Sequence, residues 1–194
     1  MGKVKLIVLV GPTASGKTAW AIGLVKKFGA EIISADSRQV YRGMDIGTAK
    51  DKSYPQHLVD IIDPDETLGV AEYKKLAIQA IGDIASQGKA PFLVGGTAQY
   101  IYAVVDNWEI PAVVPQPEIR RELEAKSLEE LQALLKEKDP EAFGFVDIKN
   151  KRRVVRALEV VMASGELFSK QRRRGESLFD TLFIGIDVPR EELN

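Results

Sequence analysis

A glycine-rich segment near the start of the chain has residue types and spacing suited to binding phosphate. It matches the pattern G-x-x-x-x-G-K-[ST] in full, through Gly11, Pro12, Thr13, Ala14, Ser15, Gly16, Lys17 and Thr18. In such loops the glycines let backbone amides face an anion, the lysine bridges phosphates and the hydroxyl side chain ligates Mg²⁺. We therefore expect a di- or triphosphate on this loop, with Lys17 on the phosphates and Mg²⁺ on Thr18.

The residues on either side of this loop favour a phosphate site over a chance glycine turn. Val4–Val10 is rich in apolar and β-branched residues, which is typical of a strand buried on both faces. Lys17–Phe28 has apolar residues at helical spacing, with Trp20 on the expected inner face, and Gly29 ends it. A strand before the loop and a helix after it are the context that the motif requires.

One carboxylate is placed to act beside the loop. Asp36 follows a short strand expected over Glu31–Ser34, and the carboxyl ends of strands in an open parallel sheet face the ligand. The strand expected over Phe92–Val94 ends in Gly95-Gly96-Thr97, where a nucleotide-hydrolysing motor would carry an acid. An aspartate in this position can also cap a turn or helix, so these residues leave both roles of Asp36 open.

The order of elements predicts an α/β fold, a P-loop parallel sheet flanked by helices, carrying an all-helical insert. Further strands are expected over Leu58–Ile62 and Thr181–Val188, and further helices over Val70–Ser86, Thr97–Val105, Pro117–Lys126, Ser127–Lys138 and Asn150–Ser164. We expect residues 1–110 and 181–194 to form the core and residues 111–180 to form the insert.

The charges balance overall, with 27 Lys+Arg against 28 Asp+Glu, but they are unevenly distributed. Nine basic and two acidic side chains lie in residues 149–174, and the rest of the chain is acidic. A basic block on an acidic body predicts an anionic partner. The alternative for such a block is a solvated helix face or, for residues 172–174, a basic loop.

Composition excludes several kinds of site. The chain has no cysteine and one histidine, His57, which argues against disulfides, thiolate or His-rich metal sites and a Ser-His-Asp triad. We interpret His57 as a polar packing residue. The apolar run Leu6–Val10 is too short to span a membrane, and no signal-peptide cleavage site follows it. We expect a cytoplasmic protein without membrane association, and nothing demands more than a monomer.

Three segments together resemble the tRNA dimethylallyltransferases, also called tRNA isopentenyltransferases. They are the loop at 11–18, residues 34–50 (Ser-Ala-Asp-Ser-Arg-Gln-Val-Tyr-Arg-Gly-Met-Asp-Ile-Gly-Thr-Ala-Lys) and residues 93–97 (Leu-Val-Gly-Gly-Thr). Residues 55–60, 63–65 and 153–160 fit the same pattern, so the resemblance covers residues 5–193. The loop is shared by many proteins, whereas the block at 34–50 is long and specific.

The resemblance implies transfer of a dimethylallyl group from dimethylallyl diphosphate to N6 of the adenosine 3′-adjacent to the anticodon in tRNA. The loop would then hold the leaving diphosphate, with Lys17 and Mg²⁺ on Thr18 stabilising its developing charge. Asp36 would be the base toward the exocyclic amine. The implied catalytic residues are therefore Asp36, Thr18 and Lys17.

The resemblance also implies a set of contacts to the anticodon stem-loop. These are Asp36, Ser37, Arg38, Gln39, Thr97, Arg120, Arg152, Arg153 and Arg156. The last three lie in the basic block, and arginine contacts to phosphates give salt-dependent affinity. The target base must leave its stack to be reached.

Departures from the family pattern leave rival functions open. Family chains usually continue past the segment resembling Ile184–Leu193, whereas this sequence stops at Asn194, so we expect a shortened or a truncated protein. Ala98-Gln99 and Gly144–Lys149 also depart from the family pattern. The rivals are a P-loop small-molecule or nucleotide kinase, whose insert arginines would clamp phosphates, and a non-catalytic RNA-binding remnant. A relative that prenylates free adenine nucleotides would not need the basic block.

Overall fold

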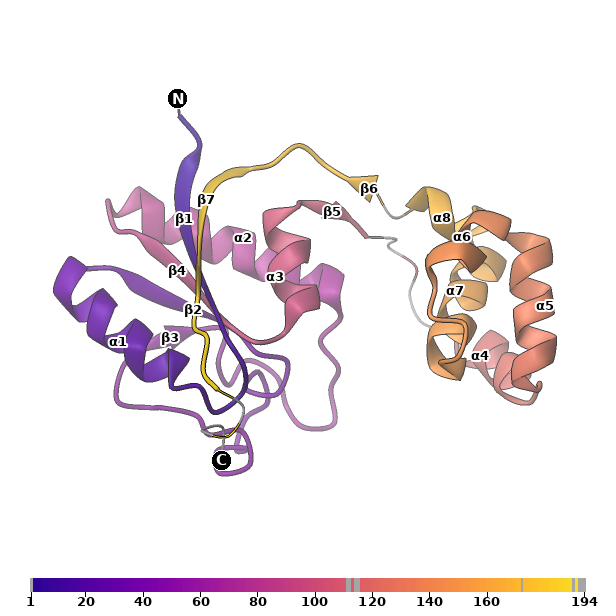
Figure 1. Cartoon of the computed structure of the whole chain (residues 1–194), viewed down its shortest axis with the longest axis horizontal. Helices are drawn as coiled ribbons and strands as arrows, with labels where there is room; N and C mark the ends of the chain where they lie inside the picture. Colours follow the sequence, from indigo (N-terminus) through magenta and orange to yellow (C-terminus); the bar gives the residue numbers. More distant parts are fainter. Residues whose placement is uncertain (1, 111–112, 114–115, 172, 190, 192–194) are drawn as a thin grey trace. The chain divides into compact units, whose positions relative to one another are not determined.

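The computed structural model describes residues 2–110, 113, 116–171, 173–189 and 191. Five strands within them form one sheet in the order β3-β2-β4-β1-β7, with every neighbouring pair parallel (Figure 1). The strands are β1 (Val4–Val10), β2 (Glu31–Ala35), β3 (Gln56–His57), β4 (Pro91–Gly95) and β7 (Phe179–Gly185). The structure thus confirms an α/β fold with a parallel sheet.

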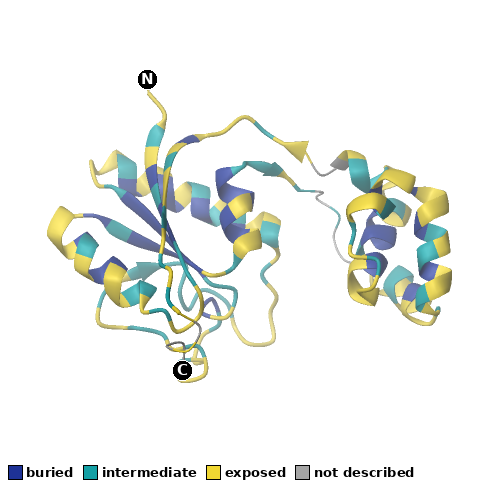
Figure 2. Cartoon of the chain, in the orientation of Figure 1, coloured by how far each residue is buried: buried dark blue, intermediate teal, exposed yellow. Residues whose placement is uncertain are grey.

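Helices cover both faces of this sheet (Figure 2). On one face, α1 (Lys17–Phe28) packs against Leu9 and Ile32. On the other, α2 (Val70–Ser86) and α3 (Ala98–Val105) enclose a second core. The inner strands β2 and β4 are therefore buried on both sides, as their apolar composition predicts, whereas Leu182 and Phe183 on the edge strand β7 are exposed.

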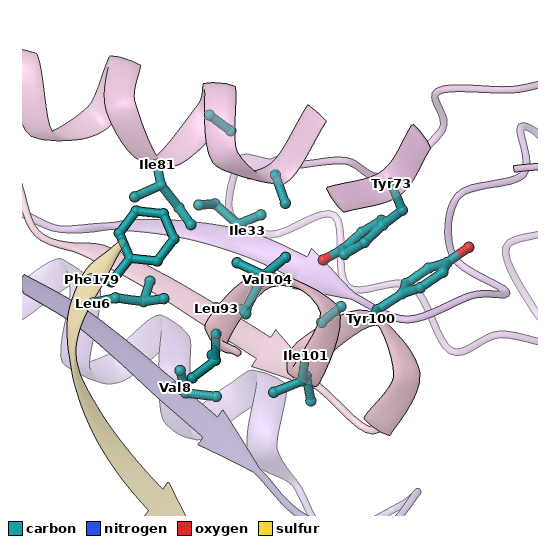
Figure 3. Close-up of a cluster of buried hydrophobic side chains, with 14 of the residues drawn as sticks. Leu6, Val8, Ile33, Tyr73, Ile81, Leu93, Tyr100, Ile101, Val104 and Phe179 are labelled. Atoms are coloured by element: carbon teal, nitrogen blue, oxygen red, sulfur yellow. The ribbon is translucent and has the colours of Figure 1, made fainter. Parts of the chain in front are cut away.

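The core beneath α2 and α3 includes a pair of stacked tyrosines (Figure 3). Tyr73 and Tyr100 have ring centroids 3.7 Å apart and nearly parallel planes. The Tyr73 hydroxyl donates to the carbonyl of Ser34 at 2.8 Å, near the end of β2. Burial raises the pKa of Tyr73, so this hydroxyl stays protonated and keeps donating.

The chain divides into two units, one of Met1–Trp108 with Gly175–Asn194 and the other of Glu109–Arg174. The sequence pattern put these boundaries at 110/111 and 180/181. The described helices of the second unit are α4 (Pro117–Glu124), α5 (Leu128–Lys138), α6 (Pro140–Phe145), α7 (Lys151–Ser164) and α8 (Phe168–Gln171). They enclose a core of their own that includes Leu123, Leu131, Leu135 and Leu158.

The second unit is not purely helical, which corrects the expected all-helical insert. Two short strands, β5 (Trp108–Glu109) and β6 (Arg173–Arg174), pair with each other. Two-residue strands carry too little alternation to be read from sequence. The helix ends are as local chemistry predicts: Ser127 forms a capping box with Glu130 at the start of α5.

Two further sequence predictions were wrong. No strand forms over Leu58–Ile62, because Leu58 and Asp60 adopt positive φ angles of 63° and 57° and interrupt the extended backbone. Ile62 alone forms an isolated bridge, with Tyr41. Trp20 does not lie on the inner face of α1 but is 61% exposed.

Gly95 allows the ends of β4 and β2 to approach each other closely. A Cβ built on Gly95 would lie 2.2 Å from the carbonyl oxygen of Ala35, whereas one on Gly96 would lie no closer than 3.6 Å to any neighbour. We expect Gly95→Ala to lower the free energy of unfolding by about 1–3 kcal/mol, because neighbouring backbone must move. Urea denaturation measures this loss. Gly96→Ala is the matched control, and equal losses in the two variants would contradict the explanation.

Candidate functional site

The phosphate loop follows β1 and leads into α1, as the sequence predicts. Gly16, at φ 72°, is the N-cap of α1 and forms no side-chain capping bond. Ala14 also has a positive φ, of 66°. Backbone of this kind directs successive N–H groups toward one point, and the helix N-terminus adds partial positive charge. The loop therefore offers an anion-binding concavity.

Lys17 folds back over this loop. Its ammonium donates to the carbonyl of Pro12 at 2.8 Å. Burial lowers the pKa of Lys17, and the negative charge of Asp36 opposes that shift. A Cβ on Gly96 would lie 3.9 Å from the Lys17 Nζ. Lys17, Asp36 and the turn after β4 therefore belong to one site.

The hydroxyl of Ser15 indicates that the loop binds a ligand. Its Oγ is buried and has no hydrogen-bond partner among the described residues. A Cβ on Gly11 would lie 2.9 Å from this Oγ and 3.2 Å from the Ile186 Cβ, so only glycine fits beside it. Buried hydroxyls are normally paired, and an anion oxygen in the loop would supply the missing partner.

Asp36 and Thr97 lie in the turns that follow β2 and β4 at the carboxyl edge of the sheet. The backbone N–H of Arg38 donates to Oδ1 of Asp36 at 2.8 Å, which orients the carboxylate. Thr97 Oγ1 accepts from the Ser37 N–H at 3.0 Å, and the Thr97 N–H donates to the Ala35 carbonyl at 3.1 Å. The turn after β2 is therefore held against the turn after β4, beside the phosphate loop.

Gln39 is buried in this turn, and both ends of its amide bind within the chain. Ser34 Oγ donates to Gln39 Oε1 at 3.1 Å, and Gln39 Nε2 donates to the Thr48 carbonyl at 3.1 Å. The Arg38 side chain, by contrast, is exposed. Of the two, Arg38 is the side chain that reaches solvent.

A buried carboxylate in the second unit organises two of the sequence-predicted arginines. Glu159 on α7 is fully buried, and its Oε2 accepts from Arg120 at 2.7 Å and from Arg156 at 2.8 Å. Its Oε1 accepts from the Gln116 N–H at 2.8 Å, just before α4. Burial would raise the pKa of Glu159, but the hydrogen bonds from Arg156, Arg120 and Gln116 lower it overall. Glu159 is therefore a charged anchor between α4 and α7.

Arg152 and Arg153 are exposed in the first turn of α7. Arg153 forms a long ion pair with Asp147, at 3.4 Å. Cations at a helix N-terminus oppose the helix dipole, so they do not serve helix stability. Arg172 of the basic block lies outside the described residues.

The described residues contain no group of three or more His, Cys, Asp or Glu side chains able to hold a metal ion.

The Nε2 atom of His57 lies 2.7 Å from Oε2 of Glu31, within hydrogen-bonding distance. None of the described helices has the length and apolarity needed to cross a membrane.

Sequence reasoning missed two buried charged residues, Glu159, which pairs with Arg120 and Arg156, and Lys50, which pairs with Asp60. Arg156 and Glu159 are spaced (i, i+3) on a helix, which is a readable pairing. Arg120 comes from another helix, and Lys50 lies in an irregular segment. No local pattern signals such pairings.

Comparison with known proteins decides the family. The family model described as IPP transferase matches residues 39–194, and that described as isopentenyl transferase matches residues 3–59. A tRNA dimethylallyltransferase of Roseiflexus sp. (strain RS-1) is 48% identical over 98% of this chain. The chain belongs to the tRNA dimethylallyltransferase family. A second family member, from Bacillus licheniformis, is 43% identical over 100% of the chain.

Solved family structures share the fold. The tRNA isopentenylpyrophosphate transferase of Bacillus halodurans is 40% identical over 94% of the chain, with a TM-score of 0.60. A eukaryotic dimethylallyltransferase described as acting on tRNA is 28% identical over 94% of the chain, with a TM-score of 0.75. The chain spans 65% of the Roseiflexus relative and 66% of the Bacillus licheniformis relative.

Proposed function

We propose that this protein transfers a dimethylallyl group from dimethylallyl diphosphate to N6 of the adenosine 3′-adjacent to the anticodon in tRNA. The observation that carries the proposal is the position of Asp36 at the carboxyl end of β2, in a turn held against the turn after β4 and beside the phosphate loop with its Lys17. Membership of the tRNA dimethylallyltransferase family supports the same reaction. We place the protein in the cytoplasm with its tRNA substrate.

In this proposal the loop at 11–18 binds the diphosphate. The amides at the start of α1 and the Lys17 ammonium hold its oxygens, and Ser15 Oγ gains the partner that it lacks among the described residues. As the bond between the allylic carbon and oxygen breaks, charge grows on the diphosphate, beside the backbone amides of the loop. Lys17 must release the Pro12 carbonyl to contact the ligand.

Thr18 is the residue that we assign to Mg²⁺. The described residues offer no cluster of carboxylates, and Mg²⁺ commonly keeps several waters while binding few protein oxygens plus substrate phosphates. A single hydroxyl in the first turn of α1 fits that coordination. When bound, the ion would neutralise charge on the diphosphate.

Asp36 is the proposed base. The N6 amine forms the new bond to the allylic carbon, the carbon–oxygen bond breaks, and diphosphate departs with its electron pair. Asp36 takes the proton that the amine gives up. The Arg38 N–H keeps Oδ1 oriented, and Thr97 holds the turn.

Contacts to the anticodon stem-loop are proposed for Ser37, Arg38 and Thr97 near the site and for Arg152 and Arg153 on α7. The buried Gln39 supports these contacts indirectly, through its hydrogen bonds to Ser34 and Thr48. Arg120 and Arg156 contribute from the positions in which Glu159 holds them. A kinase is not favoured, because the family models, relatives and solved structures that the chain matches are dimethylallyl or isopentenyl transferases.

Incubation with dimethylallyl diphosphate, Mg²⁺ and an unmodified tRNA tests the proposal. We expect N6-prenylated adenosine in the digested tRNA, and diphosphate released in equal amount, by mass spectrometry. Consumption of ATP with a small acceptor, without prenyl transfer, would overturn it in favour of a kinase. Binding of tRNA without either reaction would overturn it in favour of a non-catalytic RNA-binding protein.

A further inference from the structure

A buried ammonium lies in the irregular segment that follows Asp36. The side chain of Lys50 is 1% exposed. Its Nζ donates to Asp60 Oδ1 at 2.6 Å, to Asp45 Oδ1 at 3.3 Å and to the Tyr41 carbonyl. A buried charge is tolerated only with partners of this kind. Lys50 thereby joins three stretches of chain at one point.

These contacts close residues 36–50 onto residues 60–62. The Ile61 N–H donates to the Val40 carbonyl at 2.8 Å, and the Asp60 N–H donates to the Gln39 carbonyl at 3.1 Å. The Arg42 N–H returns a bond to the Ile62 carbonyl at 2.8 Å. The segment is irregular in backbone but is held by these bonds, and the buried Lys50 ammonium joins its last residue to Tyr41, Asp45 and Asp60.

The backbone beside Lys50 is strained in the same place. Ala49 and Asp60 are non-glycine residues with φ angles of 48° and 57°. Such conformations persist only where the surrounding contacts over-determine them. The ion pairs of Lys50 are contacts of that kind, because Lys50 follows Ala49 directly and binds Asp60 itself.

Lys50 is connected to Asp36 through the chain that leads from Tyr41 back to Gln39. Lys50 holds the Tyr41 carbonyl, Val40 is fully buried, and Gln39 ties the start of the segment to Thr48. Loss of the ammonium would leave Asp45 and Asp60 without the buried cation that joins them, so the segment would loosen from this end.

We propose that Lys50 is a positioning residue for Asp36, acting by clamping residues 36–50 through Tyr41, Asp45 and Asp60. This rests on the proposed function for its effect on turnover, although the clamp can be measured without it. Lys50 touches neither the diphosphate nor the amine in this scheme.

Lys52 provides a matched control within the same cluster. It pairs with the same two carboxylates, with Asp45 Oδ2 at 2.5 Å and Asp60 Oδ2 at 3.9 Å. Its side chain, however, is 60% exposed. Lys52→Met therefore removes one positive charge from the cluster without opening its centre.

The experiment compares Lys50→Met, Lys50→Met/Asp60→Asn and Lys52→Met with the parent chain. The double variant removes a carboxylate that has lost its buried cation in Lys50→Met, and it replaces the single variant if that one does not fold. Hydrogen exchange of the amides at 37–42, affinity for inorganic diphosphate and kcat for prenyl transfer are measured in each. We expect faster exchange and a kcat about 10- to 100-fold lower without Lys50, because small displacements of a catalytic group are costly. Diphosphate affinity should change less than about twofold, since the phosphate loop is untouched.

Lys52→Met should match the parent in all three measurements. Unchanged exchange at 37–42 without Lys50 would overturn the proposal whatever the turnover. Equal changes in exchange and kcat in Lys50→Met and Lys52→Met would also overturn it, because the loss of one positive charge would then explain both variants. A loss of diphosphate affinity as large as the loss of kcat in Lys50→Met would overturn it as well. If the parent chain shows no prenyl transfer, the proposed function fails, and the exchange measurement still decides whether Lys50 is the clamp.

Discussion

Replacement of Asp36 by Asn should reduce kcat for prenyl transfer by about 10²- to 10⁴-fold, the range typical of a lost general base. The amide retains an oxygen that can accept from the Arg38 N–H, so the turn after β2 survives. Binding of tRNA and of diphosphate should therefore change little. Single-turnover kinetics with quantified N6-prenyladenosine measures the loss directly.

Comparison of Asp36→Ala with Asp36→Asn separates the role of this residue as a base from its role in holding the turn after β2. It removes both the base and the acceptor of the Arg38 N–H, so it should lose the same turnover as Asp36→Asn and also loosen the turn. Asp65→Asn, at an exposed site, is the charge-matched control. Turnover near that of the parent in Asp36→Asn would remove Asp36 from the mechanism and leave it as a turn residue.

Much of the first unit could be predicted because local pattern and tertiary burial agree there. The strand at Val4–Val10 and the helices at Lys17–Phe28 and Val70–Ser86 have the bounds expected from their periodicity and end signals. The phosphate loop is recognisable because its chemistry requires consecutive residues. Asp36 could be placed beside it because parallel strands end at one edge of the sheet.

Other features depend on contacts that periodicity does not encode. Trp20 fits the apolar spacing of α1, yet Ala21, Ile22 and Val25 are the buried residues of that helix. At Leu58–Ile62 the composition favours a strand, but the positive φ of two residues follows from docking on residues 39–42. In both cases tertiary packing overrides a correct local preference.

The arginines show the same limit at the level of function. By sequence, Arg120, Arg152, Arg153 and Arg156 are equivalent positive charges. The structure divides them, because Glu159 binds Arg120 and Arg156 and leaves Arg152 and Arg153 exposed on α7. We expect the two pairs to affect different properties of the protein.

Arg152→Ala/Arg153→Ala should weaken tRNA binding by about 10- to 100-fold at low salt and flatten the log–log salt slope by about two, because each arginine that binds a phosphate contributes about one to that slope. The free energy of unfolding should stay constant or rise slightly, since two cations leave the N-terminus of α7. Titration of labelled tRNA at several salt concentrations, with urea denaturation of the same variants, gives both quantities.

Arg120→Ala/Arg156→Ala should show the opposite pattern. Without both guanidinium groups, the fully buried carboxylate of Glu159 loses its charged partners, at a cost of about 3 kcal/mol in the free energy of unfolding. The salt slope should change less than in the Arg152/Arg153 variant. Adding Glu159→Gln to this variant should recover part of the stability, because the uncompensated charge is gone. A stable Arg120/Arg156 variant with a strongly flattened slope would instead make these two arginines the residues that bind phosphate and Glu159 a dispensable partner.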